Sequence, residues 1–400
     1  SSIISHLCNR RGVYRMSNYF LSFLIFSPLI GMLVLAFLPR TNEKLIKLVG
    51  VLATLPALAL ALTAYFQYRG GVALTEFAES RSWFQFANPR VVTDFYGDGH
   101  FTGISYELGL NGFSLVMILL TAVLSTLAAI ASIHIKKEWK GYFLLFLLLQ
   151  VGMLGVFASE NLLLFFIFFE ITLIPMFFLI GKWGYFEKEN AAYRFLIYNG
   201  LGSAILLIVF IILYTKTGTM NIAEITQMVT SNSGLAAPMT DGFRMGLLIA
   251  LLVAFGIKLP IVPLHSWMLK VHVQAPPSIV MLHAGVLLKI GAYGLIRFGV
   301  IMFPEQFSQL SFILAILGVV NLLYGAFLAF IQTDFKMVLA YSSISHMGIV
   351  LIGLAALNEA GVQGAIFQVV SHGFIAALLF FLIGVMYERV GTTNIAKLGG

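Results

Sequence analysis

The chain has 400 residues, of which 60% are hydrophobic and 10% charged, and its formal net charge is +7. A soluble domain carries roughly 25% charged residues, so this composition excludes an ordinary water-soluble globule and indicates a polytopic membrane protein. The single cysteine, Cys8, excludes iron–sulfur clusters and disulfide frameworks within the chain, because each needs several cysteines. A Walker-type phosphate loop and a dinucleotide fingerprint are also missing from the sequence.

Eleven apolar stretches are long enough to cross a bilayer. A spanning helix needs about 20 mostly apolar residues, and such stretches are too long and too uniform for the strands of an outer-membrane barrel. We therefore predict an all-α polytopic membrane protein. The stretches are centred near residues 28, 56, 122, 149, 171, 203, 254, 288, 320, 347 and 374.

Basic residues are distributed unequally over the connections, numbered by the span that each connection follows. Odd-numbered connections carry thirteen lysines and arginines, and even-numbered connections carry six. The positive-inside rule therefore predicts cytoplasmic odd connections and an external N-terminus in the inner or plasma membrane. This distribution does not indicate nucleic-acid binding. Arg10, Arg11 and Arg15 contradict the orientation, so we expect residues 1–15 to be an extension upstream of a true start at Met16.

Two connections, residues 67–107 and 217–243, are long and polar and lie on the predicted outer side. Long connections of this kind are usually surface loops without chemistry of their own. We expect loops there, with at most a short hairpin or interfacial helix.

Three charged residues, Glu170, Lys258 and Lys289, lie near the middle of predicted spans. A charge at the bilayer centre costs about 2.5 to 3.5 kcal/mol on insertion scales, and such residues usually face the bundle interior or a hydrated path. Burial opposes the charge on a carboxylate or an ammonium group, whereas attraction between the two favours both charges. If Glu170 and Lys258 lie within salt-bridge reach, they form a proton switch that responds to their separation.

The seventh span contains Pro260 and Pro263 directly after Lys258. Proline removes a backbone donor and clashes with the preceding turn, so the helix must break or kink near residue 259. Broken helices in transporters are found where ions bind. We therefore predict an ion path at Lys258, with His265 in the same segment as a secondary candidate.

Histidines also fall inside the predicted spans. His346 and His372 can relay protons, because histidine titrates near pH 6.5, although each could equally be a hydrogen-bonded interior residue. His283 precedes Lys289 by six residues and so would lie on a different face of a regular helix. Haem ligation would need two facing histidines on neighbouring helices, and the sequence gives no sign of such a pair.

Long motifs around these residues resemble a known family. They are FEITLIPM at 169–176, LPIVPLHSW at 259–267, VHVQAP at 271–276, LLKIGAYGLIRF at 287–298 and DFKMVLAYSSISHMG at 334–348. Over residues 16–400 the sequence is similar to the antiporter-like membrane subunits of respiratory NADH-quinone oxidoreductase (complex I), and among these to the chain M type.

The resemblance implies a fourteen-helix antiporter-like fold with two inverted five-helix repeats and a broken seventh helix, of which about eleven helices fall in this chain. Residues 16–139 would hold helices 1–3, residues 140–300 the first repeat and residues 301–400 part of the second repeat. The chain ends at Gly400, so we expect the second broken helix to lie beyond it. Another departure is Met268-Leu269, where relatives commonly have Leu-Pro after the tryptophan.

The resemblance also implies a proton-translocating subunit of NADH:quinone oxidoreductase, coupled to quinone reduction elsewhere in the complex. By position, Glu170 and Lys258 match the carboxylate–lysine pair, Lys289 the central lysine, and His346 and His372 the second half of the path. Quinone, FMN and iron–sulfur clusters would belong to partner subunits, leaving this chain without a cofactor or metal. Its partners would be other membrane subunits, the bilayer and protons.

Other functions compete with this one. A subunit of a multi-subunit Na⁺/H⁺ antiporter or of a membrane-bound hydrogenase would share the fold and the buried lysines, and residues 271–276 favour chain M over both. An independent secondary transporter would be active as an isolated chain. A purely structural membrane spacer is disfavoured by three costly buried charges.

Overall fold

The computed structural model describes residues 19–86, 102–235 and 237–399, so the expected extension over residues 1–15, with Met16 and Cys8, lies outside the described residues. In the described part, ten helices are long and apolar enough to cross a membrane. The remaining predicted span, the seventh, centred near residue 254, is an interrupted helix made of α11 (Asp241–Lys258) and α12 (Ser266–Gln274). The prediction of an all-α polytopic membrane protein is confirmed, with a small β-hairpin added.

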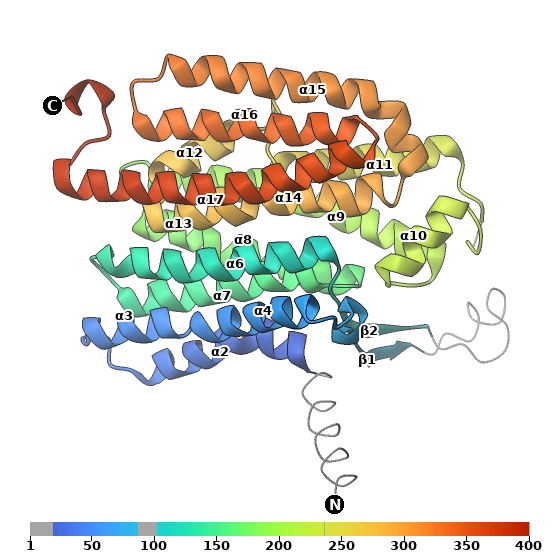
Figure 1. Ribbon diagram of the computed structural model, residues 1–400, viewed down its shortest axis with the longest axis horizontal. Coiled ribbons are helices and arrows are strands. Elements are labelled where there is room, and N and C mark those ends of the chain that lie inside the picture. Colours follow the sequence, from blue (N-terminus) through green and yellow to red (C-terminus); the bar gives the residue numbers. More distant parts are fainter. Residues whose placement is uncertain (1–18, 87–101, 236, 400) are drawn as a thin grey trace, which may run out of the picture.

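The N-terminal helices form a layer along one side of the bundle (Figure 1). Gly31 permits close packing there, because an added Cβ would overlap Ala53. The predicted second span is divided between two consecutive helices, α3 and α4. The elements of this layer are α2 (Phe20–Phe37), α3 (Glu43–Leu52), α4 (Leu55–Arg69), α6 (Gly112–Ala131) and the short 3₁₀ turns Leu74–Phe77 and Ser132–His134.

The connection over residues 67–107 contains a two-stranded hairpin. Strand β1 (Glu79–Phe86) pairs antiparallel with β2 (Thr102–Leu108). The hairpin is attached to α2, because the Ser22 hydroxyl donates to the Glu79 carboxylate and lies 2.8 Å from the Tyr106 hydroxyl. This connection therefore holds the hairpin that the sequence allowed.

The connection over residues 217–243 contains a short helix, α10 (Ile222–Ser231). Figure 1 shows α10 and the hairpin at the same end of the bundle, which we call the hairpin end; the other end is the opposite end. Five helices that start at the hairpin end are capped by side chains that accept a backbone N–H, as N-cap residues typically do. The caps are Asn111, Asn161, Asn221, Thr240 and Asn358.

Two helix pairs pack through glycines. Helix α7 (Trp139–Ala158) folds back on α8 (Leu162–Trp183), and α15 (Pro304–Phe330) folds back on α16 (Phe335–Ala355). A Cβ added to Gly155 of α7 would overlap the Phe168 ring. A Cβ added to Gly325 of α15 would lie 2.7 Å from the Tyr341 carbonyl oxygen. Small residues thus let the helices approach closely in both pairs.

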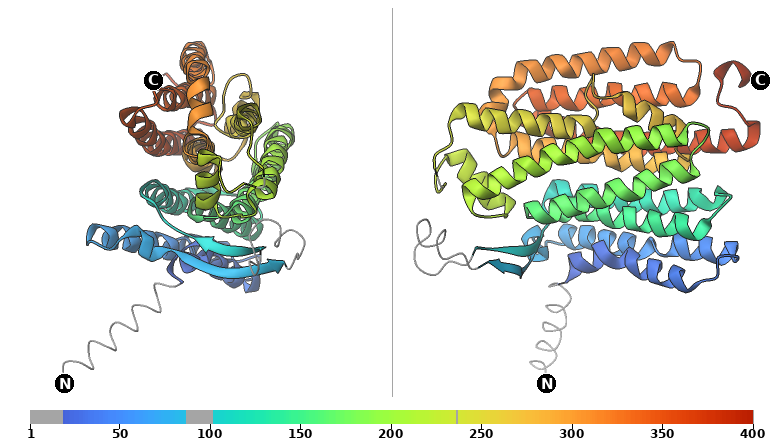
Figure 2. Two further views of the ribbon diagram at one scale, coloured as in Figure 1. Left: turned by 90° about the vertical axis from the view of Figure 1, so that its right-hand side faces the viewer. Right: turned by 180° about the vertical axis from the view of Figure 1, so that it is seen from behind.

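A fully buried helix over residues 277–300 runs through the centre of the bundle. It is partly π-helical and lies among the long helices α9 (Lys188–Thr217) and α17 (Glu359–Val390). Viewed end-on, the N-terminal layer, the central helices and the group α15–α17 follow one another across the molecule (Figure 2). The remaining segments are α13 (Pro277–Leu282), the π-helical η3 (His283–Leu287), α14 (Leu288–Gly294), the π-helical η4 (Leu295–Val300) and the 3₁₀ turn Ile395–Lys397.

Candidate functional site

The helix break occurs where the prolines predict it. Helix α11 ends at Lys258, and the chain becomes helical again at Ser266. Asn321 of α15 satisfies the exposed backbone, because its side-chain amide donates to the Pro260 carbonyl (2.9 Å) and accepts from the Val262 N–H (2.8 Å). Such a break is tolerated at membrane depth only when protein or water satisfies its polar groups. One asparagine therefore holds the break open and in place.

Trp267 bridges the two ends of the break. The Trp267 indole N–H donates to the carbonyls of Ile257 (3.0 Å) and Leu264 (3.1 Å), and so joins the end of α11 to the start of α12. His265 lies on the wall of the break, with Nε2 3.0 Å from the Tyr324 hydroxyl. The structure does not bring His265 together with the other predicted site residues through any contact among the described residues.

Lys258 is buried, with 3% of its surface exposed, and its ammonium lies 4.5 Å from the centroid of the Phe169 ring. Among the described residues, no ion pair within 4.0 Å joins it to Glu170. The two charges attract one another at longer range, and Glu170 Oε1 is buried without a hydrogen-bond partner in the described part of the chain. The salt bridge that the sequence suggested is thus absent, because Phe169 takes the place beside the ammonium.

Two buried histidines meet next to the break. His272 Nε2, on α12, lies 2.8 Å from His283 Nδ1, on the π-helical segment η3. His283 is also within electrostatic range of both Lys258 and Lys289. A π-helical turn widens the backbone and changes the direction of its side chains. The helix is not regular here, and His283 faces α12, whereas Lys289 contacts His372 on α17.

Lys289 is completely buried and firmly held. Its ammonium donates to the Ala284 carbonyl at 2.6 Å and lies 2.6 Å from His372 Nδ1 on α17. The His372 ring is 5.1 Å from the His346 ring, measured between centroids, and His346 Nδ1 lies 2.9 Å from Gln368 Nε2. These contacts bring together Lys289 and both histidines that the sequence singled out.

Seven buried or half-buried ionisable groups form one series through the bundle. It starts at Glu170 and Lys258, passes the pair His272 and His283, and continues through Lys289 to His372 and His346. Sequence reasoning singled out five of these seven residues and missed the role of the other two as a bridge. The signal was present, because His272 is an ionisable residue between two apolar neighbours in VHVQAP.

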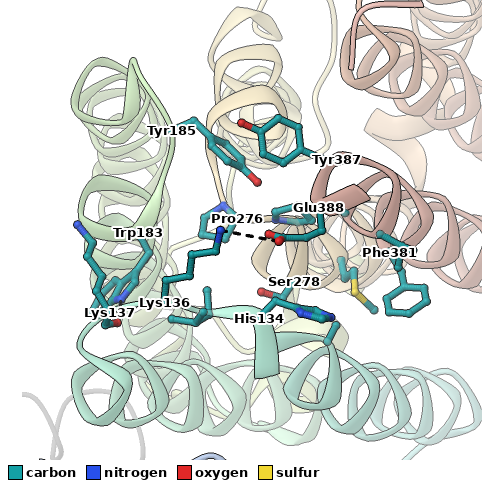
Figure 3. Close-up of a pocket in the computed structure, with 16 residues that line it drawn as sticks. His134, Lys136, Lys137, Trp183, Tyr185, Pro276, Ser278, Phe381, Tyr387 and Glu388 are labelled. Carbon is teal, nitrogen blue, oxygen red and sulfur yellow. Dashed lines mark hydrogen bonds and ion pairs between the residues drawn. The ribbon is translucent and has the colours of Figure 1, made fainter. Parts of the chain in front are cut away.

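A cavity of about 330 Å³ lies at the opposite end of the bundle. Lys136 and Glu388 face each other across it with 3.8 Å between Nζ and Oε2, and the rings of Tyr185 and Tyr387 lie together on its wall (Figure 3). Behind these rings, Lys336 is buried, with its Nζ 3.8 Å from the centroid of the Tyr185 ring.

Lys336 also reaches the broken helix. Its ammonium donates to the Val273 carbonyl on α12 at 3.3 Å, and Val273 follows His272 directly. The contacts thus lead from the cavity wall, through Lys336, to the last turn of α12. Lys336 is thus another buried lysine, and its partner Val273 directly follows His272 of the histidine pair.

The chain is similar to known proteins over most of its length. The family model described as NADH:quinone oxidoreductase/Mrp antiporter, TM, matches residues 159–400. The chain is 36% identical to NADH-quinone oxidoreductase subunit M of Rhodobacter capsulatus over 391 residues, covering 95% of this chain and 72% of that protein. It is 38% identical to NAD(P)H-quinone oxidoreductase chain 4 3 of Trichormus variabilis over 383 residues, covering 95% of this chain and 67% of that protein.

A solved structure has the same fold. A chain of respiratory complex I from Thermus thermophilus with bound NADH superposes with a TM-score of 0.77 at 28% identity, covering 94% of this chain and 73% of that chain. The resemblance to the chain M type is confirmed by sequence, and the antiporter-like fold by structure. The chain therefore belongs to the NADH:quinone oxidoreductase/Mrp antiporter transmembrane family.

Proposed function

We propose that this chain is the proton-translocating membrane subunit of an NADH- or NAD(P)H-quinone oxidoreductase. The observation that carries the proposal is the series of buried and half-buried ionisable groups from Glu170 to His346, which lie on seven helical segments. Buried charges in membranes are costly and mark ion pathways and proton relays. Its relatives, subunit M and chain 4 of quinone oxidoreductases, support the same assignment.

Protons would move between neighbouring groups of this series. Lys289 and His372 are 2.6 Å apart, so a proton shared between them is transferred without large movement. At the other end, Lys258 has no ion-pair partner within 4.0 Å among the described residues, so approach of Glu170 would favour its charged form. The series therefore combines a short proton transfer between Lys289 and His372 with a step at Lys258 that depends on its distance from Glu170.

Water is expected along part of the series. Glu170 Oε1 and His272 Nδ1 are buried without a hydrogen-bond partner among the described residues. A buried polar group left unsatisfied costs about 1–3 kcal/mol. Ordered water commonly satisfies such groups. Water between Glu170, Lys258 and the histidine pair would complete a continuous proton path.

The cavity at the opposite end is a suitable place for proton uptake. It contains the Lys136–Glu388 pair, and its wall leads through Tyr185 and Lys336 to the turn that carries His272. The opposite end is also the side that the positive-inside rule assigns to the cytoplasm. In this proposal protons enter from the cytoplasm at Glu388 and reach the series at the histidine pair.

Redox chemistry would take place in partner subunits. The proposal assigns quinone, FMN and iron–sulfur clusters to those subunits, and the other membrane subunits would transmit quinone reduction to the buried charges of this chain. We also propose that residues 140–300 and 301–400 belong to two related repeats. The two glycine-packed helix pairs, α7–α8 and α15–α16, support this, because each stands at the start of one repeat.

Replacing Lys258 tests the proposed function. In the assembled complex, Lys258→Ala should lower proton pumping by about tenfold or more, since it removes a proton acceptor from the series. Lys182→Ala is the matched control, because that lysine lies at the opposite end with half of its side chain exposed. The measurement is protons pumped per NADH in vesicles, with assembly followed by native gel. Normal pumping by an assembled Lys258→Ala complex would exclude the role.

A subunit of a multi-subunit Na⁺/H⁺ antiporter is the second candidate, because the matching family model covers Mrp antiporters as well. The same buried groups could then exchange protons against sodium ions. Sodium dependence of proton movement distinguishes the two functions. Pumping that is driven by NADH and unchanged without sodium supports the oxidoreductase subunit.

A further inference from the structure

A buried arginine lies between the ionisable series and the hairpin end. Arg297, on η4, is 9% exposed and follows Lys289 by eight residues on the same fully buried helix, or about 12 Å along the axis. The sequence motif that carries Lys289 continues to this arginine, and the proton path proposed above does not use it. Arginine keeps its charge at every physiological pH, so Arg297 cannot serve as a relay.

Strong bonds hold the guanidinium in one position. Its Nη1 donates to the Ser159 carbonyl (2.7 Å) and to the Tyr293 hydroxyl (2.7 Å), and its Nη2 donates to Glu160 Oε2 (2.8 Å). Charge-assisted bonds of this length are about twice as strong as neutral ones. Glu160 in turn belongs to the hairpin end, because its N–H donates to the Glu107 carbonyl of β2. The positive charge is thus fixed at the base of the hairpin end.

Aromatic rings fill the space between Arg297 and Lys289. The Tyr293 ring, one turn after Lys289, packs against Phe113 and Phe157 with centroid distances of 5.3 and 5.2 Å. Phe255 and Phe298 stack on each other at 5.8 Å, and the Phe165 ring joins them to Tyr293, with centroid distances of 5.0 Å to Phe298 and 6.5 Å to Tyr293. Phe157, Phe255 and Phe298 are fully buried. Among these six rings only Tyr293 carries a polar group, and its hydroxyl binds Arg297 and lies 3.2 Å from the buried Ser114 hydroxyl.

We propose that Arg297, with Tyr293 and Glu160, seals the ionisable series against the hairpin end. The guanidinium is paired with Glu160 and keeps its proton, so behind the aromatic layer it passes no proton on and disfavours cations beside it, as an arginine does in membrane pores. The seal keeps protons that enter at the opposite end from crossing directly to the hairpin end beside Lys289. They must instead continue to His372 and His346. This inference rests on the proposed function, because a seal matters only if the series carries protons.

Passive proton leak in the resting complex tests the seal. The complex is reconstituted in liposomes without NADH, and an imposed pH gradient is followed with an entrapped fluorescent dye. Arg297→Gln should raise the leak about tenfold or more, since it removes the fixed charge from the barrier. Arg297→Lys keeps a positive charge and should remain tight. Glu160→Gln keeps the arginine and should remain tight as well.

The double variant Arg297→Gln/Glu160→Gln protects the test against misfolding. Removing Arg297 alone leaves the half-buried Glu160 carboxylate without its ion-pair partner, which is destabilising, whereas the double variant leaves no unpaired carboxylate there. It should assemble and leak like Arg297→Gln. Adding Lys289→Ala should suppress that leak, because the path through the series is then interrupted.

Each result bears directly on the seal. A leak in Arg297→Gln and in the double variant, but not in Arg297→Lys or Glu160→Gln, supports the seal. An assembled double variant without leak overturns it. Equal leak in Arg297→Lys, or a leak that persists with Lys289→Ala, also overturns it, because the cause is then loosened packing or a route outside the series. The proposed function is tested separately, since pumping is measured during NADH oxidation and the leak without it.

Discussion

Lys258 and Lys289 are the same residue type, both buried in the same bundle, and the structure holds them in opposite ways. Lys258 ends a helix at a break and lies over the Phe169 ring, with its acidic neighbour beyond ion-pair distance. Lys289 lies in a continuous, fully buried helix and has two partners at 2.6 Å. The first lysine has room to change its environment, and the second does not.

This difference suggests a division of labour. A proton switch needs a group whose surroundings change, and Lys258, which has no ion pair or hydrogen bond to another described residue, is the less restrained of the two lysines. A relay needs fixed donors and acceptors, because transfer over a short distance fails when the groups move apart. We therefore expect substitutions at Lys289 to act on the transfer itself and substitutions around Lys258 to act on its control.

The largest effect is expected for Lys289→Met. Methionine fills similar space without a charge, so His372 and the Ala284 carbonyl lose their common donor. Proton pumping should fall by about tenfold or more. The check is pumping per NADH in vesicles, with the exposed Lys397→Met as control. If Lys289→Met pumps normally, Lys289 is not a relay.

A smaller effect is expected for Glu170→Gln, because Lys258 loses an attractive charge that acts only at longer range. Pumping should fall severalfold, by about threefold to tenfold. Glu170→Asp keeps the charge and should retain most of the pumping. A loss for Glu170→Gln as large as that for Lys289→Met would contradict the division of labour.

Asn321→Leu tests the break without touching a charged residue. The variant leaves the Pro260 carbonyl and the Val262 N–H without their partner, and each unsatisfied buried group costs about 1–3 kcal/mol. The solubilised variant complex should lose activity at a lower temperature than the complex with Asn321, and its proton pumping should fall about twofold to threefold. Leu323→Ala, on the same helix but 48% exposed, is the control and should change neither.

The smallest effect is expected for Tyr324→Phe. The change removes the hydroxyl at 3.0 Å from His265 Nε2 and leaves the ring in place. Because His265 has no described contact with the ionisable series, pumping should change by less than about twofold. A larger loss, measured in the same vesicle assay, would show that His265 belongs to the path after all.

Much of the fold was predictable from local sequence. The lengths of the apolar stretches predicted the positions of the spans. Pro260 and Pro263 predicted the helix break directly after Lys258. Both features arise from the chain's immediate neighbourhood: hydrophobic burial acts on each stretch of residues, and proline acts on its own turn. The hairpin depended on pairing between two segments of a polar connection, which the sequence allowed without specifying.

The sequence by itself indicated that Lys258 and Lys289 are buried, because a charge inside a long apolar stretch has no route to water. Lys336 and Arg297, which it placed in connections, are buried as well. Only the tertiary structure decided which of those groups meet. The pair His272–His283 depends on a π-helical turn, and the contact of Lys289 with His372 joins residues 83 positions apart. Phe169, rather than Glu170, lies beside Lys258. Such contacts depend on how whole helices rotate and pack against one another, and no local pattern of residues sets that rotation.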